Sequence, residues 1–252
     1  MDAENKSVAQ MKAVTISREY GSGGGEVAAR TASRLGWQLI DHEIVAQVAQ
    51  RLHISEKEAE DNDEYAESLT ERIFQSLQLI QPTMPVTVPI RVTVNSLAFH
   101  EARCRILEAA AAKGHVVIVG RGAQALFAKQ RDMLHIRIVA PLEARIAYVM
   151  QRENLSREDA RARIQQKDQD RIRYLQIYYR KHPADAHLYD LVLNTAILDL
   201  ESVVAIIYRA LEAKAKRLSL ATGELGAVQG LPPYPGLPGD IRPPESAESS
   251  SI

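Results

Sequence analysis

Short runs of β-branched and aliphatic residues alternate with longer segments of helical character along most of the chain. Five of these runs predict buried strands, at 13–17, 38–40, 116–119, 134–139 and 191–194. Helices are expected at 26–35, 43–52, 93–113, 142–153, 156–181 and 200–217. Because strands that alternate with helices usually pair in parallel, the pattern predicts a three-layer α/β fold with a central parallel sheet of about five strands.

Local signals mark the ends of several of these segments. Gly36 and Gly114 follow helical stretches, where glycine commonly ends a helix. Ser156 and Asp159 have the spacing of a helix N-terminal capping box. The acidic segment 55–81 is typical of a solvated face, and three prolines interrupt the chain after it.

The composition divides the chain into three parts. Residues 1–12 form a polar N-terminal extension, and 13–217 hold all the predicted strands and helices. Residues 221–252 are rich in Pro, Gly and Ser and lack a hydrophobic pattern, so we expect a disordered tail.

Charge and cysteine content exclude several classes of protein. The formal net charge of −1 gives no global attraction for nucleic acid or anionic lipid. The single cysteine, Cys104, excludes an internal disulfide and a cysteine-rich zinc site, and it is expected to be a half-buried helix thiol with no histidine paired to it. Without an apolar signal segment or a span-length apolar run, a cytoplasmic protein is expected.

The strongest chemical signal is a glycine-rich loop between the first strand and the first helix. It consists of Gly21, Ser22, Gly23, Gly24 and Gly25. Glycines let successive backbone N–H groups point inward, and a helix N-terminus adds positive potential. The loop therefore predicts a phosphate-binding site, with a flexible turn as the alternative.

The loop departs from the common GxxxxGK[ST] phosphate-loop sequence. If Gly23 is the glycine before the lysine, Gly24 occupies the lysine position and Arg18 that of the first glycine. Since that lysine normally neutralises the β- and γ-phosphates, either another cation replaces it or phosphate binds without efficient transfer. Glu26 can be an Mg²⁺ ligand or a favourable acid in the first helical turn, and we prefer the second interpretation.

Several ordered segments resemble the cytidylate kinase-like family. They are VTISREYGSGGGEVAARTASRLGWQLIDHEIV, VVIVGRGAQALF, HIRIVAPLEARI, KDQDRIRYLQIYY and YDLVLNTAILDLESVVAII. The resemblance covers about 13–216 and implies a P-loop nucleoside triphosphatase fold, with a helical acceptor-side insertion at 55–92 and an arginine-rich lid at 154–181. It also implies ATP and Mg²⁺ as cofactors.

The resemblance assigns roles to particular residues. It implies that the glycine loop holds the donor phosphates, and that Asp41 and Arg121 bind the acceptor. Gly120 and Arg121 match the Gly-Arg of the family's GRD motif, but Gly122 stands in place of the aspartate, which leaves CMP in doubt as the acceptor. Arg171 and Arg173 resemble the lid arginines that contact phosphate.

The chemistry of phosphoryl transfer explains this residue choice. The acceptor attacks directly, so the protein needs to position the phosphates and to neutralise charge, and arginine binds phosphate oxygens with two parallel hydrogen bonds. We therefore predict Arg18, Arg121, Arg171 and Arg173 as catalytic, with Arg18 replacing the missing lysine; no metal ligand is identified. Most other lid arginines are expected to pair with surface acids.

Three functions remain open at this stage. The leading one is ATP-dependent phosphoryl transfer to a nucleoside monophosphate, CMP-like, or to a similar small phosphate acceptor. The alternatives are a catalytically weak nucleotide-binding sensor or interaction module, and a kinase of a non-nucleotide metabolite. Expected partners are the two small molecules, with no nucleic acid and no membrane, and a homodimer is a possible assembly.

Overall fold

The computed structural model describes residues 8–41, 44–45, 73 and 96–226, and the chain divides into two units, Met1–Lys216 and Arg217–Ile252. The strands are β1 (Ala13–Arg18), β2 (Gln38–Ile40), β3 (Val116–Val119), β4 (Met133–Val139) and β5 (Leu191–Asn194). The α-helices are α2 (Gly24–Leu35), α5 (Ser96–Lys113), α6 (Ala123–Leu126), α7 (Leu142–Glu153), α8 (Arg157–Tyr179) and α9 (Leu200–Ala215). Two 3₁₀ turns are η2 (Ala186–Leu188) and, in the second unit, η3 (Thr222–Glu224).

The five strands form one sheet in the order β2-β3-β1-β4-β5. Every pairing is parallel, and the central strand β1 aligns Ile16 with Val119 of β3 and Ile136 of β4. The predicted parallel sheet is therefore confirmed. Because parallel strands end at the same edge, the segments that follow β1, β3 and β4 meet there, where open α/β sheets bind ligands.

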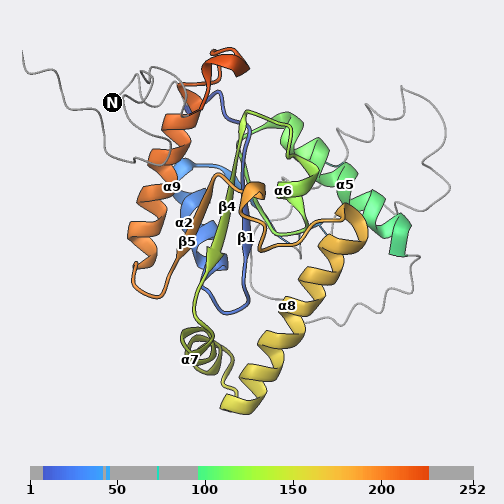
Figure 1. The fold of residues 1–252 in the computed structure, drawn as a ribbon, viewed down its shortest axis with the longest axis vertical. Helices are drawn as coiled ribbons and strands as arrows, with labels where there is room; N and C mark the ends of the chain where they lie inside the picture. The colour runs from blue at the N-terminus through green and yellow to red at the C-terminus, as the bar shows by residue number, and fades with distance from the viewer. Residues whose placement is uncertain (1–7, 42–43, 46–72, 74–95, 227–252) are drawn as a thin grey trace, which may run out of the picture. The chain divides into compact units, whose positions relative to one another are not determined.

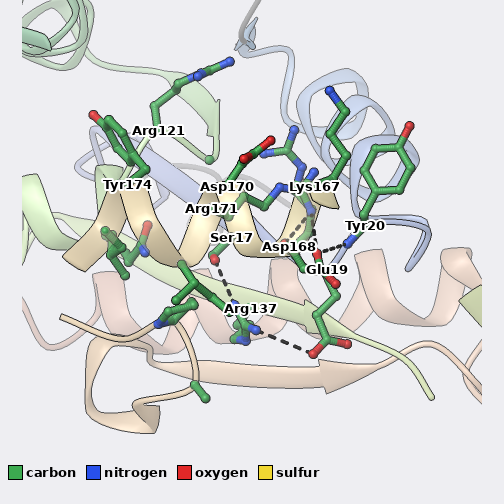
Figure 2. Close-up of a pocket in the computed structure, with 18 of the residues that line it drawn as sticks. Ser17, Glu19, Tyr20, Arg121, Arg137, Lys167, Asp168, Asp170, Arg171 and Tyr174 are labelled. Atoms are coloured by element: carbon green, nitrogen blue, oxygen red, sulfur yellow. Dashed lines mark hydrogen bonds and ion pairs between the residues drawn. The ribbon is translucent and has the colours of Figure 1, made fainter. Parts of the chain in front are cut away.

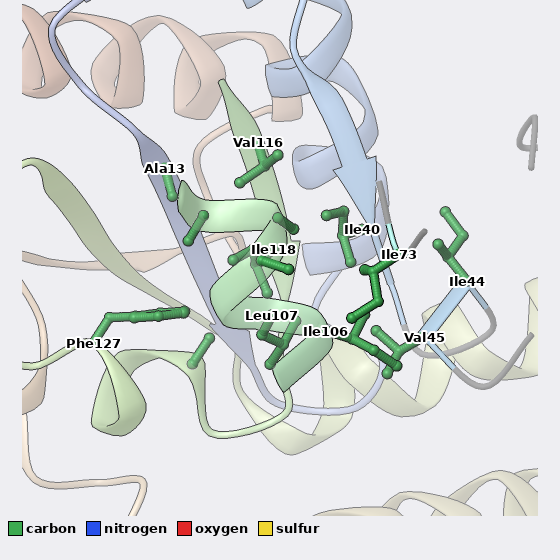
Figure 3. Close-up of a cluster of buried hydrophobic side chains, with 14 of the residues drawn as sticks. Ala13, Ile40, Ile44, Val45, Ile73, Ile106, Leu107, Val116, Ile118 and Phe127 are labelled. Atoms are coloured by element: carbon green, nitrogen blue, oxygen red, sulfur yellow. The ribbon is translucent and has the colours of Figure 1, made fainter. Parts of the chain in front are cut away.

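Helices cover both faces of the sheet (Figure 1). Helices α2 and α9 pack together on one face, whereas α5 packs on β3 from the other. On the α5 side, Val116 and Ile118 of β3 join Ile106 and Leu107 of α5 in a buried apolar cluster that also includes Ile40 (Figure 3). This cluster fixes the end of β3, and with it the turn that begins at 120.

The helix bounds follow the sequence prediction with small shifts. Helix α2 begins at Gly24, two residues earlier than expected, because Gly23 in the left-handed region (φ 72°) already directs the chain into the helix. Helix α9 ends at Ala215, and the short helix α6 and the turn η2 had not been predicted. The Ser156 cap is confirmed, since its side chain accepts the Asp159 backbone N–H.

Some predictions fall on chain that the structure does not describe. Of the predicted helix 43–52, Ile44 and Val45 are described and helical, and of the insertion 55–92 only Ile73, which is buried. The predicted tail, 221–252, lies in the second unit, and its residues from 227 are outside the described range. In the predicted polar extension, Val8 and Met11 are buried, so its end contributes to the core.

Candidate functional site

The glycine loop shapes a cavity of about 350 Å³ between β1 and α2. Gly21 has a positive φ of 81°, and a Cβ there would lie 2.8 Å from the Val149 side chain and 2.9 Å from the Arg145 carbonyl. The Ser22 hydroxyl donates to the carbonyl of Glu19 at 2.9 Å, so it holds the loop's own curvature. We call this space the loop cavity; residues 18–26 line it together with Ala29, Tyr148, Val149, Arg152, Glu153 and Arg171.

Arg18 fills the space that the missing lysine side chain would need. A Cβ built on Gly24 would lie 2.6 Å from the Cβ of Arg18, a distance that real Cβ atoms essentially never show. The Arg18 side chain continues to Gly120, where an added Cβ would lie 2.2 Å from its Nη1 atom. A lysine at position 24 is therefore incompatible with the place that the Arg18 side chain occupies.

Arg121 is held in an unusual turn after β3. Gly120, Arg121 and Gly122 have consecutive positive φ values of 74°, 59° and 70°. Because only glycine adopts this region without strain, the two flanking glycines are suited to the turn that presents Arg121. At Gly122 an added Cβ would lie 2.6 Å from the Tyr179 ring, so the aromatic side chain takes the room that a GRD aspartate would need.

A second and larger cavity, of about 760 Å³, lies under helix α8 at the carboxyl ends of β1, β3 and β4 (Figure 2). Arg18, Glu19, Tyr20 and Arg171 line it as well as the loop cavity, so the two spaces share a wall. Its lining contains six Lys or Arg side chains and four carboxylates. The cations are Arg18, Arg121, Arg137, Arg163, Lys167 and Arg171, and the acids are Glu19, Asp41, Asp168 and Asp170.

Two of these cations are largely buried and form no ion pair within the described chain. Burial, with Arg171 and Arg121 nearby, lowers the pKa of Arg18 to about 9. Burial and the Arg103 guanidinium lower the pKa of Arg121 to about 10. Within the described part of the chain, neither guanidinium forms an ion pair with a carboxylate, although the charge of Asp41 opposes both pKa shifts.

Helix α8 is tied to the start of the glycine loop through Asp168. The Asp168 carboxylate accepts the backbone N–H of Tyr20 at 2.8 Å. It also pairs with Arg145 at 2.6 Å and with Arg171 at 3.3 Å. Arg171 also donates to the carbonyl of Arg18 at 3.1 Å. Although burial lowers the pKa of Arg171, Asp168 opposes that shift.

The structure separates the two predicted lid arginines. Arg171 lines both cavities, whereas Arg173 is exposed and is not among the described residues lining either one. Residues two apart on an α-helix point about 200° apart, so only one of them can face the sheet. The expected pairing of other lid arginines with acids is confirmed for Arg163, which contacts Glu153. Arg157 pairs with Glu143, and Arg152 of α7 pairs with Glu26.

Asp41, at the end of β2, lines the large cavity and caps the next helix by accepting the Ile44 N–H at 3.0 Å. Arg137 was missed by sequence reasoning, although an arginine within the apolar run of β4 was a visible signal. Its guanidinium lies on the cavity floor with Ser17 and Glu19.

The expectation of no histidine beside Cys104 is also wrong. His100 lies one helical turn earlier on α5, with its Nε2 atom 3.6 Å from the Cys104 sulfur. Tyr178 of α8 stacks on His100, with ring centroids 3.9 Å apart. Burial raises the pKa of the Cys104 thiol, which argues against a nucleophile.

The carboxylates around the loop cavity are already engaged. Glu26 contacts the Tyr148 hydroxyl and Arg152, which supports the first-turn interpretation over that of a dedicated Mg²⁺ ligand. Glu153 accepts from Tyr20 and Arg163. Among the residues that the structure describes, no group of three or more His, Cys, Asp or Glu side chains could hold a metal.

Comparison with known proteins agrees with this geometry. The model of the cytidylate kinase-like family matches residues 13–197. The chain belongs to this family. It is 33% identical over 116 residues to a cytidylate kinase of Methanopyrus kandleri, covering 43% of this chain and 60% of that protein. It is 27% identical over 202 residues to a cytidylate kinase of Ignicoccus hospitalis, covering 80% of this chain and 99% of that one.

A solved structure supports the fold of this family member. An uncharacterised protein from Eubacterium ventriosum superposes with a TM-score of 0.55 at 19% identity, covering 80% of this chain and 99% of that one. None of the helices within the described ranges is long and apolar enough to cross a membrane.

Proposed function

We propose that this protein transfers a phosphoryl group from ATP to a small phosphate-bearing acceptor. The observation that carries the proposal is the pair Arg18 and Arg121, two largely buried guanidiniums that form no ion pair with a carboxylate among the described residues. Both line the large cavity, and Arg18 also lines the loop cavity. Buried cations need an anionic partner, and phosphate suits the planar fork of arginine. The family membership supports phosphotransfer as the chemistry.

The two cavities suggest how donor and acceptor are arranged. The β- and γ-phosphates of ATP would bind the backbone N–H groups of the glycine loop, at the N-terminus of α2. The acceptor phosphate would bind Arg121 in the large cavity, with Asp41 on the same side. Arg18 and Arg171 line both spaces, so they can contact the phosphoryl group as it passes between them.

No enzyme nucleophile is needed for this transfer. An acceptor phosphate oxygen forms the new bond to the γ-phosphorus while the bond to the β-γ bridging oxygen breaks, which leaves ADP. The protein contributes alignment and fixed positive charge, and a preorganised charged donor is typically worth about 100-fold or more in turnover. We assign that contribution chiefly to Arg18, in place of the loop lysine, and to Arg171 rather than Arg173.

Mg²⁺ is expected to bind together with ATP, coordinated by its phosphates, rather than at a preformed set of protein ligands. Magnesium is commonly bound through substrate phosphates, water and one or two carboxylates, and the acids at the loop cavity are engaged with neighbouring side chains. The ion would add charge neutralisation to the donor phosphates. The chain itself would hold the phosphates and exclude water under α8.

The acceptor class is broader than the family name suggests. Because Tyr179 fills the space beside Gly122, the carboxylate of the GRD motif has no counterpart at this position. A nucleoside monophosphate, CMP-like, and a non-nucleotide phosphate ester are therefore both candidates. The net charge of −1 supports small-molecule partners rather than nucleic acid or membrane, and we keep a cytoplasmic location and a possible homodimer as predictions.

The direct test is ADP formation by the purified protein with ATP, Mg²⁺ and a panel of nucleoside monophosphates and small phosphate esters. We expect product with one acceptor class. ATP binding without product from any acceptor would contradict the proposal and favour a nucleotide-binding module.

A reciprocal exchange tests the role of Arg18. Arg18→Gly should lower turnover about 100-fold or more, and Gly24→Lys alone should be inactive because its Cβ collides with Arg18. The double variant Arg18→Gly/Gly24→Lys restores the first glycine and the lysine of the common loop, though not its Ser/Thr, and should recover part of the loss. Turnover equal to that of Arg18→Gly alone would mean that Arg18 does not act as the lysine substitute.

A further inference from the structure

The large cavity contains a buried guanidinium that the proposed transfer does not use. Arg137 lies near the carboxyl end of β4, which pairs with the central strand β1. Only 8% of the residue is exposed. Figure 2 shows it below α8, between Ser17 and Glu19. It therefore lies on the floor of the cavity, on the opposite side of β1 from Arg121, which follows β3.

Arg137 makes few contacts for a buried arginine. A guanidinium has five N–H donors. Here Nη1 donates to the Ser17 hydroxyl at a long 3.3 Å, and Nη2 lies 3.6 Å from a Glu19 carboxylate oxygen, beyond normal hydrogen-bond distance. Most donors of this side chain are thus left without a partner in the described part of the chain, while the side chain lines a cavity.

Glu19 is an incomplete counter-ion for Arg137. The same carboxylate lies 3.6 Å from Arg145 and accepts the backbone N–H of Ala140 at 3.2 Å. Arg145 is in turn paired more closely with Asp168, which also serves Arg171. Three guanidiniums, those of Arg137, Arg145 and Arg171, therefore share the carboxylates of two acids, and the formal charge of this group is positive. The acids are Glu19 and Asp168.

The polar groups around Arg137 are held in place. The Tyr189 hydroxyl donates to the Pro183 carbonyl at 2.9 Å and lies 3.3 Å from the Ser17 hydroxyl. The guanidinium carbon of Arg137 lies 5.8 Å from the centre of the Tyr189 ring. Because its neighbours are fixed, Arg137 can receive a ligand group without reorganising the floor.

We propose that Arg137 binds a second anionic group of the acceptor, a carboxylate or another phosphate. The acceptor would then carry at least one anionic group besides its reacting phosphate. The inference rests on the proposed phosphotransfer, since it places the acceptor's reacting phosphate at Arg121. A cavity of about 760 Å³ has room for a ligand that carries anionic groups at both ends. Arg137 is thus a specificity-determining residue.

The test uses matched ligand pairs in the presence of ADP, with dissociation constants measured by calorimetry. Two pairs differ only in a carboxylate against an alcohol, 3-phosphoglycerate against glycerol 3-phosphate and 6-phosphogluconate against sorbitol 6-phosphate. A third pair, fructose 1,6-bisphosphate against fructose 6-phosphate, differs in a second phosphate. We expect the parent protein to bind the more anionic member at least tenfold tighter in one or more pairs, and the pair concerned identifies the group.

The variants separate recognition from structural support. Arg137→Met should remove the preference and leave the ADP affinity within about twofold, whereas Arg137→Lys, which keeps the charge, should retain part of it. Glu19→Gln removes the carboxylate that competes for Arg137, so it should increase the preference for the more anionic ligand. If the Arg137–Glu19 pair were purely structural, this variant would lower that preference. Arg30→Met, an exposed arginine paired with Glu201, is the matched control and should behave as the parent.

Two results would overturn the inference. They are equal affinities within every pair in the parent protein, and an unchanged preference in Arg137→Met. If the parent binds neither ADP nor any phosphomonoester, the proposed function itself fails, and that outcome is distinct because it is visible without any variant.

Discussion

Arg18 and Arg121 are single side chains that the fold keeps positively charged at a cost. Both are largely buried, both have lowered pKa values, and each lies near further arginines. An unpaired buried charge destabilises a folded protein, so such residues usually persist because a ligand needs them. Under the proposed function, phosphate binding would compensate for this loss of stability.

Replacing Arg18 by Met should raise the melting temperature of the ligand-free protein at pH 7 by a few degrees. The pKa of Arg18 is about 9 in the folded protein against 12.5 for the ordinary side chain. Below pH 9 both the folded and unfolded states are protonated, so the destabilisation is fully present. Above pH 9 the unfolded state binds more protons, so stability rises with pH and the advantage of Arg18→Met should shrink.

Thermal melts of the parent and of Arg18→Met between pH 7 and 10 check this sign. Added inorganic phosphate should stabilise the parent more than the variant at pH 7. A variant that melts below the parent at every pH would show that Arg18 is instead a structural support.

At the scale of elements, helix α8 contacts both the start of the glycine loop and the turn after β3. Asp168 accepts the Tyr20 N–H, and Arg171 donates to the Arg18 carbonyl, so the helix contacts the backbone on both sides of Glu19. At its other end Tyr179 packs on Gly122. One helix thus contacts the chain at the end of β1, where Arg18 lies, and the turn after β3, which carries Arg121.

Arg171→Ala should lower turnover about 100-fold, with a smaller effect on ATP affinity, because its contribution is to the transferring phosphoryl group. Arg173→Ala is the matched control on the same helix, and its exposed side chain should make a change of less than about twofold. Steady-state kinetics and ATP calorimetry on both variants decide between them. Equal effects of the two substitutions would contradict the separation that the helix geometry makes.

Gly122→Asp should destabilise the protein by about 2 kcal/mol, because the new side chain must displace the Tyr179 ring. Tyr179→Ala creates room, so in the double variant the part of the cost of Gly122→Asp that comes from the collision should disappear, while the strain of a side chain at φ 70° remains. Urea denaturation of the two single variants and the double variant measures this coupling. Additive effects would show that Tyr179 is not the reason for glycine at position 122.

For the whole molecule, the sheet and the flanking helices belong to the first unit, Met1–Lys216, and every residue of both cavities lies within it. The family model also ends before the second unit, at residue 197. Ligand binding should therefore depend on the first unit.

Removal of 221–252 should change the melting temperature by less than about 2 °C and the ATP affinity by less than about twofold, since this segment has no hydrophobic pattern with which to pack. Differential scanning calorimetry and ATP titration of the truncated and full chains make the comparison. A large loss of either quantity would mean that the segment contributes to the folded domain.

The sequence by itself determined the strands, most helix bounds, the glycine loop and the family. These features depend on local patterns: β-branched runs, helix-ending glycines, the Ser156 cap and the spacing of ordered motifs. It also singled out Arg18 and Arg121, because both follow strands whose carboxyl ends meet at one edge.

Only the tertiary structure decided which polar side chains act together. The collision between Gly24 and Arg18, the packing of Tyr179 on Gly122 and the position of Arg137 on the cavity floor all join residues far apart in the chain. Likewise, the sequence alone does not distinguish Arg171 from Arg173. They differ because Arg171 lies on the side of α8 that faces the cavity, whereas Arg173 is exposed to water. Such contacts depend on how strands and helices pack, and a local pattern carries no information about the partner across the fold.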